Sequence, residues 1–132
     1  MTRPAVLVTG AAKRIGAAIA RRFALDGWHV VIHYGRSAAE AEALAATLPS
    51  AEVFGCDLRD EIAAAAMVEK LAQRLSDWRV LVNSASIFVP DDAAFLDPET
   101  NRRTMQINAR TPVIMAQAFL RHAHASGGRR VI

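Results

Sequence analysis

Short apolar runs alternate with longer segments of helical periodicity along the whole of this chain. The apolar runs are AVLV at residues 5–8, HVVIH at 29–33, EVFG at 52–55, RVLV at 79–82 and RRVI at 129–132. The second run is almost continuously apolar, as expected of a strand that is covered on both faces. Strands that alternate with helices in this way form parallel sheets through crossover connections. The alternation therefore predicts an α/β fold.

The first two helical segments carry their own boundary signals. Ile15, Ile19 and Phe23 recur every four residues, which predicts one apolar helix face that ends near residues 26–27. The sequence SAAE at residues 37–40 is a capping box, in which the serine and the glutamate accept from free amides at a helix start. A second helix is therefore expected to begin there.

Two further helices follow, separated by a loop rich in Asp and Pro at residues 90–98. Their apolar positions are Met67, Leu71 and Leu75 in the third helix, and Met105, Ile107, Ile114 and Phe119 in the fourth. Pro112 lies four residues after Asn108, so the Asn108 carbonyl loses its helical partner and a kink is expected there. A carbonyl freed in this way can hold a water, and the alternative is a kink that serves packing alone.

The amino-acid composition indicates one globular domain and argues against a disulfide framework or a metal site. The 132 residues, 52% hydrophobic and 22% charged, suit one globular domain. The single cysteine, Cys56, excludes an internal disulfide and a cysteine-based zinc site, and is expected to be a small core residue. The spacing of the four histidines indicates no metal site.

The charge and hydropathy patterns argue against two kinds of partner. The net charge of +3 is dispersed over 16 basic and 13 acidic residues, which does not indicate a nucleic-acid-binding surface. No window approaches the roughly 18 apolar residues of a membrane span, and the first residues do not form a signal-peptide core. We therefore expect a cytoplasmic protein that binds neither nucleic acid nor membrane.

A glycine-containing turn follows the first apolar run. Gly10 permits a tight turn at the strand exit, and Gly16 allows the next helix to pack closely on the strand. This arrangement directs backbone N–H groups and the positive end of a helix toward a pyrophosphate. The strict G-x-G-x-x-G spacing is absent, and glycines at strand exits also occur as simple turn residues.

Four motifs occur in a recognisable order: TGAAKRIG at residues 9–16, CD at 56–57, NSAS at 83–86 and INARTP at 107–112. Together they resemble the short-chain dehydrogenase/reductase family, over essentially the whole chain but only about the first half of a family member. The family turn is usually TGxxxGxG, so Arg14 stands in place of its middle glycine. Lys13 with Arg14, and HYGRSA at 33–38, resemble the pteridine reductase branch. A guanidinium at this point can reach a phosphate oxygen or a polar edge of a substrate.

Cofactor choice in such folds is decided at the end of the second strand, where an acidic residue would favour NAD. Here Arg36 and Ser37 follow that strand, and Lys13 and Arg14 add positive charge, which predicts NADP(H). Taken singly, Ser37 could only cap a helix and Arg36 could only be a solvated loop residue. The predicted cofactor-binding residues are Gly10, Lys13, Arg14, Ile15, Gly16, His33, Tyr34, Arg36, Ser37, Asp57, Leu58, Asn83, Ser84 and Ala85.

The resemblance also implies roles for single residues. Asp57 and Leu58 would border the adenine, and Asn83, Ser84 and Ala85 would line the nicotinamide ribose. Further candidates are Phe88, which matches the aromatic residue that stacks a pterin in pteridine reductases, Arg14 as a second substrate contact, and Asn108 as the catalytic asparagine. A lone Phe after a strand is otherwise a core residue.

The leading interpretation is a Rossmann-type doubly wound parallel sheet of order 3-2-1-4-5, truncated in its fifth strand. Residues 1–132 would form an incomplete dinucleotide-binding domain, because the serine and Tyr-x-x-x-Lys that the family places further on are not in this chain. The expected function is the cofactor-binding half of an NADPH-dependent oxidoreductase that transfers hydride to a C=O or C=N group of a small molecule, such as a pterin. The alternative is a non-catalytic nucleotide-binding or assembly module. A homo-oligomer is expected in either case.

Overall fold

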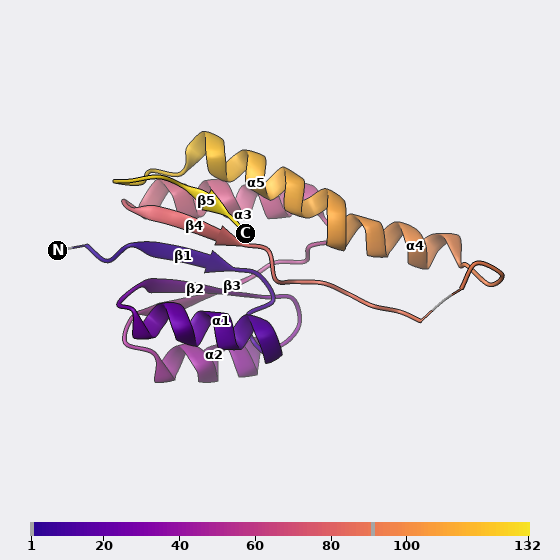
Figure 1. Ribbon diagram of the computed structural model, residues 1–132, viewed down its shortest axis with the longest axis horizontal. Coiled ribbons are helices and arrows are strands. Elements are labelled where there is room, and N and C mark those ends of the chain that lie inside the picture. Colours follow the sequence, from indigo (N-terminus) through magenta and orange to yellow (C-terminus); the bar gives the residue numbers. More distant parts are fainter. Residues whose placement is uncertain (1, 91) are drawn as a thin grey trace.

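The computed structural model describes residues 2–90 and 92–132, which form a parallel sheet with helices on both faces (Figure 1). The strands are β1 (Ala5–Val8), β2 (His29–Tyr34), β3 (Ala51–Gly55), β4 (Trp78–Val82) and β5 (Arg130–Val131). The helices are α1 (Arg14–Leu25), α2 (Ala38–Thr47), α3 (Glu61–Arg74), α4 (Pro98–Met105), the π-helical segment η1 (Gln106–Arg110) and α5 (Thr111–His122). The predicted loop at 90–98 includes residue 91, which lies outside the described residues; its remainder leads into α4 at Pro98.

The strand order is β3-β2-β1-β4-β5, with every pairing parallel. The predicted α/β fold and strand order are therefore confirmed. Central strand β1 alternates between the two layers: Ala5 and Leu7 belong to the core under α3 and α5, and Val6 and Val8 to the core under α1 and α2. The period-two alternation of a strand thus places apolar side chains on both faces.

Helix α1 packs mainly through small residues, and two of the three predicted large residues, Ile19 and Phe23, are partly buried against the same core. Its buried positions are Gly16, Ala17, Ala20 and Ala24. Ile15, expected on the apolar face, has 74% of its surface exposed. Small side chains let the helix approach the sheet closely, which leaves Ile19 and Phe23 partly buried and Ile15 outside the core. The prediction for Ile15 was therefore wrong, and those for Ile19 and Phe23 were confirmed in part.

The predicted capping box at the start of α2 does not form. Ser37 occupies the N-cap position, but its side chain makes no capping hydrogen bond within the described residues. The Glu40 carboxylate instead lies 3.8 Å from the Lys13 ammonium group. Side-chain caps do form on α3, where Asp60 accepts from two backbone amides, and on α4, where Asp97 accepts from one. The SAAE pattern therefore predicted where α2 begins but not the hydrogen bonds of a capping box.

The predicted fourth helix consists of α4, η1 and α5, which follow one another without a break (Figure 1). Its π-helical turn is closed by the Thr111 amide, which donates to the Gln106 carbonyl five residues earlier. Pro112 comes next and cannot donate to Asn108, so the predicted irregularity takes the form of one wide turn. Met105, expected on the apolar face, is 54% exposed.

The amino end of the sheet is held by a chain of polar side chains. His29, the first residue of β2, places Nδ1 at 2.8 Å from the Ser50 hydroxyl and Nε2 at 2.7 Å from the Glu52 carboxylate. Arg74 from α3 also donates to that carboxylate. The hydrogen bond from His29, and the guanidinium of Arg74, lower the pKa of Glu52 to about 2. These contacts fasten the edge strand β3 to β2 and α3.

Candidate nucleotide-binding site

A cavity of about 800 Å³ opens at the carboxyl ends of the central strands. Ligands bind at this edge of doubly wound sheets, where the strand order reverses. The predicted residues that line it are Gly10, Arg14, Ile15, Gly16, His33, Arg36, Asp57, Leu58, Ser84 and Ala85. Lys13, Tyr34, Ser37, Asn83, Phe88 and Asn108 lie outside its wall, adjacent in sequence to residues that form it. The structure thus brings most of the predicted set to one place.

The turn after β1 allows very close approach of backbone segments. Gly10 has φ +60°, and a Cβ there would lie 2.8 Å from the Cα of Ala85. A Cβ at Gly16 would lie 2.8 Å from the carbonyl carbon of Gly10. Both positions therefore require glycine: the first for its left-handed conformation and its closeness to the loop after β4, the second for packing of α1 against the turn.

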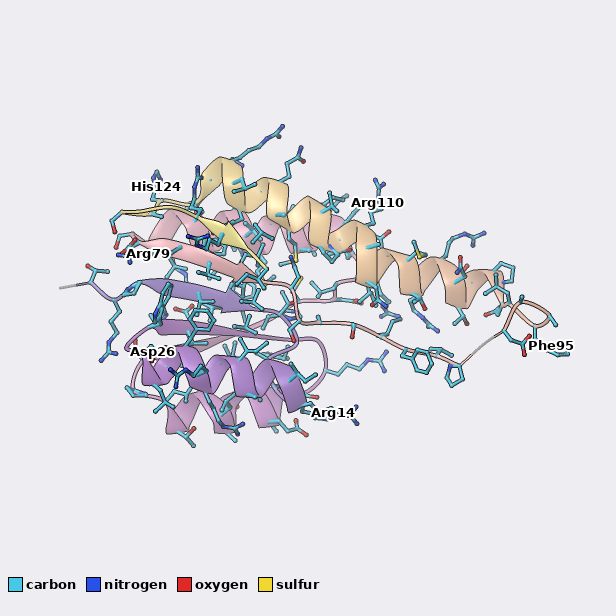
Figure 2. The ribbon with its side chains drawn as sticks, viewed as in Figure 1. Arg14, Asp26, Arg79, Phe95, Arg110 and His124 are labelled. Carbon is cyan, nitrogen blue, oxygen red and sulfur yellow. The ribbon has the colours of Figure 1, made fainter. Side chains whose placement is uncertain are left out.

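Arg14 adopts φ +52°, the only positive φ of a non-glycine residue in the described part of the chain. It begins α1, directly after the N-cap residue Lys13, and Figure 2 shows it at the end of α1 that faces the loop after β4. This left-handed conformation costs a residue with a Cβ about 1–2 kcal/mol of conformational energy. Arg14 thus has a backbone conformation typical of glycine and carries a positive charge. In the described residues no side chain caps the first amides of α1, and its first turn carries no acid. These amides and the helix dipole favour an anion.

Thr9, which the motif analysis did not select, joins β1 to the exit of β4. Its hydroxyl accepts from the amides of Ser84 and Ala85, each at 3.0 Å, and lies 3.4 Å from the Val82 carbonyl. The residue is buried to 1% exposure. A hydroxyl directly before the turn glycine was the available signal, since the strand exit of a parallel sheet lies beside its neighbour's exit.

His33 is a structural support beneath the cavity. Its Nε2 lies 2.8 Å from the Cys56 carbonyl and must donate to it, so Nδ1 accepts from the Gly10 amide at 3.0 Å. Burial lowers the pKa of His33, which keeps the ring neutral as this bonding requires. The ring thereby ties together the ends of β1, β2 and β3. The predicted cofactor-binding role rests on this support and on its place in the cavity wall.

The end of β2 presents positive charge and no acid. Arg36 lines the cavity, together with Gly35. The Ser37 hydroxyl that was expected to cap α2 makes no such bond within the described chain, as noted above. Tyr34 turns its ring toward β3, where a Cβ on Gly55 would come within 2.7 Å of it. The cation and the helix start at residues 36–37 form a second position suited to an anion.

The loop after β3 contributes the Asp57 carboxylate, which is already hydrogen-bonded to Arg59. Arg59 grips Asp57 with side-chain nitrogen-to-oxygen distances of 2.8–3.1 Å, and its backbone amide also donates to this carboxylate. These bonds lower the pKa of Asp57. Burial raises the pKa of the neighbouring Cys56 thiol. Cys56 was expected to be a small buried core residue, and it lies half-buried against the core and on the cavity wall. Asp57 is thus ionised and fixed in place.

Asn108 clamps the loop that follows β4. Its side-chain amide donates to the Ile87 carbonyl at 2.8 Å and accepts from the Ile87 amide at 2.9 Å. Phe88, the next residue, is 86% exposed. The alternative interpretation, in which Phe88 is a core residue, was therefore wrong. Ile87, Val89, Ile107 and Arg103 also line the cavity, and none of these four was predicted to be a site residue; Ile107 was expected only as an apolar helix position.

The site fits a dinucleotide on the evidence of its own atoms. Two glycines clear backbone space, α1 offers uncapped amides, and Arg14 and Arg36 stand at two separate anion positions. A cavity of about 800 Å³ is within the range of small-molecule sites. Within residues 2–90 and 92–132 no cluster of three metal-ligating side chains occurs, and no helix has the length and hydropathy needed to cross a membrane.

Comparison with known proteins places these features in a family. Residues 4–132 match the family model described as short chain dehydrogenase. The chain is 32% identical over 132 residues to a granaticin polyketide synthase putative ketoacyl reductase 2 of Streptomyces violaceoruber, covering 98% of this chain and 53% of that protein. It is 38% identical over 111 residues to pteridine reductase 1 of Leishmania tarentolae, covering 67% of this chain and 38% of that protein.

Solved structures of short-chain dehydrogenases and reductases have a similar fold. FolM alternative dihydrofolate reductase 1 of Brucella suis, crystallised with NADP, superposes with a TM-score of 0.88 at 34% identity over 97% of this chain and 55% of that one. The chain spans about half the length of most of the curated relatives it matches. The family model extends from the strand before the glycine turn through the Asn108 segment, so the turn, the strand exits and the long helix match as one unit. The chain therefore belongs to the short-chain dehydrogenase family.

Proposed function

We propose that this chain is the NADP(H)-binding part of a short-chain oxidoreductase. The observation that carries the proposal is the pair of anion positions along one cavity, at the start of α1 with Arg14 and at the start of α2 with Arg36. They match the pyrophosphate and the 2′-phosphate of NADP(H). The NADP bound to the FolM structure supports the same choice.

Each wall of the cavity has a proposed task. The amides of residues 14–16 and the Arg14 guanidinium bind the pyrophosphate, with Lys13 adding charge nearby. Arg36 and the Ser37 hydroxyl bind the 2′-phosphate, beside Tyr34. Asp57 and Leu58 border the adenine, and Asn83, Ser84 and Ala85 line the ribose at the nicotinamide end. The Thr9 and His33 hydrogen bonds hold the ends of β1, β2, β3 and β4 together for this purpose.

The bound dinucleotide supplies a hydride, and the chain supplies part of the surface on which an acceptor lies. We propose a C=O or C=N group of a planar molecule, such as a pterin, as that acceptor. The exposed Phe88 supports a planar substrate, since an aromatic face stacks favourably on a flat ring. The 38% identity to pteridine reductase 1 supports the same substrate class. Asn108 is proposed to take part in catalysis through its backbone carbonyl in η1, and it positions the loop before Phe88 through its side chain.

The test measures binding of NADPH and NADH by titration calorimetry. We expect NADPH to bind at least about tenfold more tightly, because the 2′-phosphate gains charge-assisted hydrogen bonds. Arg36→Gln should remove most of this difference and leave NADH affinity unchanged. Arg21→Gln, on an exposed position of α1 away from the cavity wall, is the control with the same loss of charge.

Equal binding of NADPH and NADH, or a preference that survives Arg36→Gln, would contradict the assignment of the 2′-phosphate position. Binding of neither dinucleotide would refute the proposed function. Bound NADPH that is never consumed with any carbonyl or imine acceptor, even in a protein that includes the Tyr-x-x-x-Lys segment, would favour a non-catalytic nucleotide-binding module.

A further inference from the structure

The charged side chains that line the cavity carry a net positive charge. Four arginines contribute to its wall, Arg14, Arg36, Arg59 and Arg103, and within the described residues Asp57 is the one acid there. Arg59 and Asp57 are joined by a two-pronged ion pair, so their charges cancel. Three positive charges remain around a single cavity.

Two of the three have anion positions in the proposed cofactor site. Arg14 stands at the start of α1, and Arg36 follows β2, so both belong to the side of the cavity formed by the first two strands and their helices. Arg103 comes from α4, which lies across the loop that follows β4 from α1 (Figure 1). The third charge is therefore supplied by a different wall.

The surroundings of Arg103 differ from those of a phosphate site. Ile107 lies four residues later, on the same helix face, and also lines the cavity. Ile87 and Val89, from the loop after β4, line the cavity as well. The cavity wall contributed by α4, η1 and the loop after β4 thus combines three apolar side chains with one cation, which suits a molecule with a flat apolar body and an anionic substituent.

The position of Arg103 is well defined by its helix. Asn108, five residues later, is fastened to the loop after β4 by the two hydrogen bonds to Ile87. The start of α4 is fixed by Asp97, whose carboxylate accepts from the amide and the hydroxyl of Thr100. Arg103 contributes to lowering the pKa of Asp97, but the bonds to Thr100 are the larger cause, so this carboxylate is already satisfied.

We propose that the substrate of this site carries an anionic group, a carboxylate in the simplest case, which is bound by Arg103. The proposal rests on the proposed function, because it treats Arg14 and Arg36 as cofactor residues. It adds a specificity-determining residue on α4 and a substrate class, planar organic anions. The hydride acceptor lies over the apolar part of the cavity, and Arg103 holds the charged end.

The test uses a matched pair of small probes, 4-fluorobenzoate and 4-fluorobenzamide, which have the same flat ring and differ in charge. Fluorine NMR titration measures the affinity of each for the protein with and without NADPH. We expect the benzoate to bind about fivefold more tightly, the value of a partly exposed ion pair near 1 kcal/mol. Arg103→Gln should abolish the preference and leave the affinity for the amide unchanged.

Arg102 offers the control variant. It is the neighbouring arginine on α4, pairs with Glu99 at 2.7 Å, and does not belong to the cavity wall. Arg102→Gln removes the same net charge and should keep the preference for the benzoate. The comparison separates a specific contact from a general attraction to a positive protein.

Three results would overturn the proposal: equal affinities or no binding of either probe, a preference that survives Arg103→Gln, or an Arg103→Gln protein that loses NADPH affinity as Arg36→Gln does. The last result would make Arg103 a cofactor residue. Failure of the proposed function is a different outcome, in which NADPH does not bind. If the Arg103-dependent preference for the benzoate is then still present, the anion site stands without the cofactor.

Discussion

Replacing Arg14 separates the backbone conformation of the glycine turn from its charge. Arg14 has φ +52°, a conformation that costs a residue with a Cβ about 1–2 kcal/mol and costs glycine almost nothing. Arg14→Ala and Arg14→Gly both remove the guanidinium, but only the glycine variant removes the strain. Glycine loses about 0.5–1 kcal/mol of this gain, because its unfolded chain has more conformational freedom.

The net expectation is that Arg14→Gly is more stable than Arg14→Ala by about 0.5–1 kcal/mol, or roughly 2–5 °C in Tm. Urea and thermal unfolding measure the difference. The same pair of substitutions at Arg21, in the interior of α1, should give the opposite sign, with alanine more stable by about 1 kcal/mol. The two sites share a helix, so the reversal reports local backbone conformation alone.

Binding should respond differently from stability. Both Arg14 variants should bind NADPH about tenfold more weakly, since each loses a charged hydrogen-bond donor at the pyrophosphate. If Arg14→Gly were less stable than Arg14→Ala, the left-handed conformation would not be the reason for the strain. Unchanged NADPH affinity in both variants would show that the guanidinium does not reach a phosphate.

Two further predictions concern the turn and the amino end of the sheet. Gly16→Ala should destabilise the protein by about 1–3 kcal/mol, because the added Cβ meets the Gly10 carbonyl, and should weaken NADPH binding; unfolding and titration of one sample measure both. Glu52 has a pKa of about 2, below its ordinary 4.5, so it stabilises the fold above pH 4.5 and this contribution is lost as the pH falls toward 2. Glu52→Gln should therefore cost roughly 1–2 kcal/mol at pH 7, after allowance for partial exposure, and much less at pH 3; a pH-independent cost in urea titrations would contradict this reasoning.

The fold could be predicted from the sequence because its signals are local and repeated. The run at residues 5–8 coincides with β1, and residues 26–27 do end α1, with Gly27 at φ +88°. The errors arose where several elements compete for one side chain. Ile15 has the helical spacing of a core residue, yet the close approach of α1 to the sheet favours its alanines, and Ile15 turns to the cavity.

In the candidate site too, residues within short motifs were predicted, and residues that depend on distant segments were not. Residues within the motifs, such as Gly10 and Gly16, were found because a turn needs them in one short segment. The support given by Thr9 depends on the exit of β4, more than 70 residues away in the chain. Arg103 lines the cavity because of the way α4 joins η1, and no short sequence pattern around Arg103 predicts this position.

The wide turn η1 also determines which residues of α4 form a wall of the cavity. Each residue of an α-helix advances it by about 100°, and a π-helical turn holds one residue more than an α-helical turn. Loss of a single residue from Gln106–Arg110 would therefore rotate all of α4 by about 100° while α5 kept its packing on the sheet. Arg103 would leave the cavity, and another side chain of α4 would replace it. In this fold a change of chain length by one residue, with no substitution at the site, is enough to exchange the surface that meets the substrate.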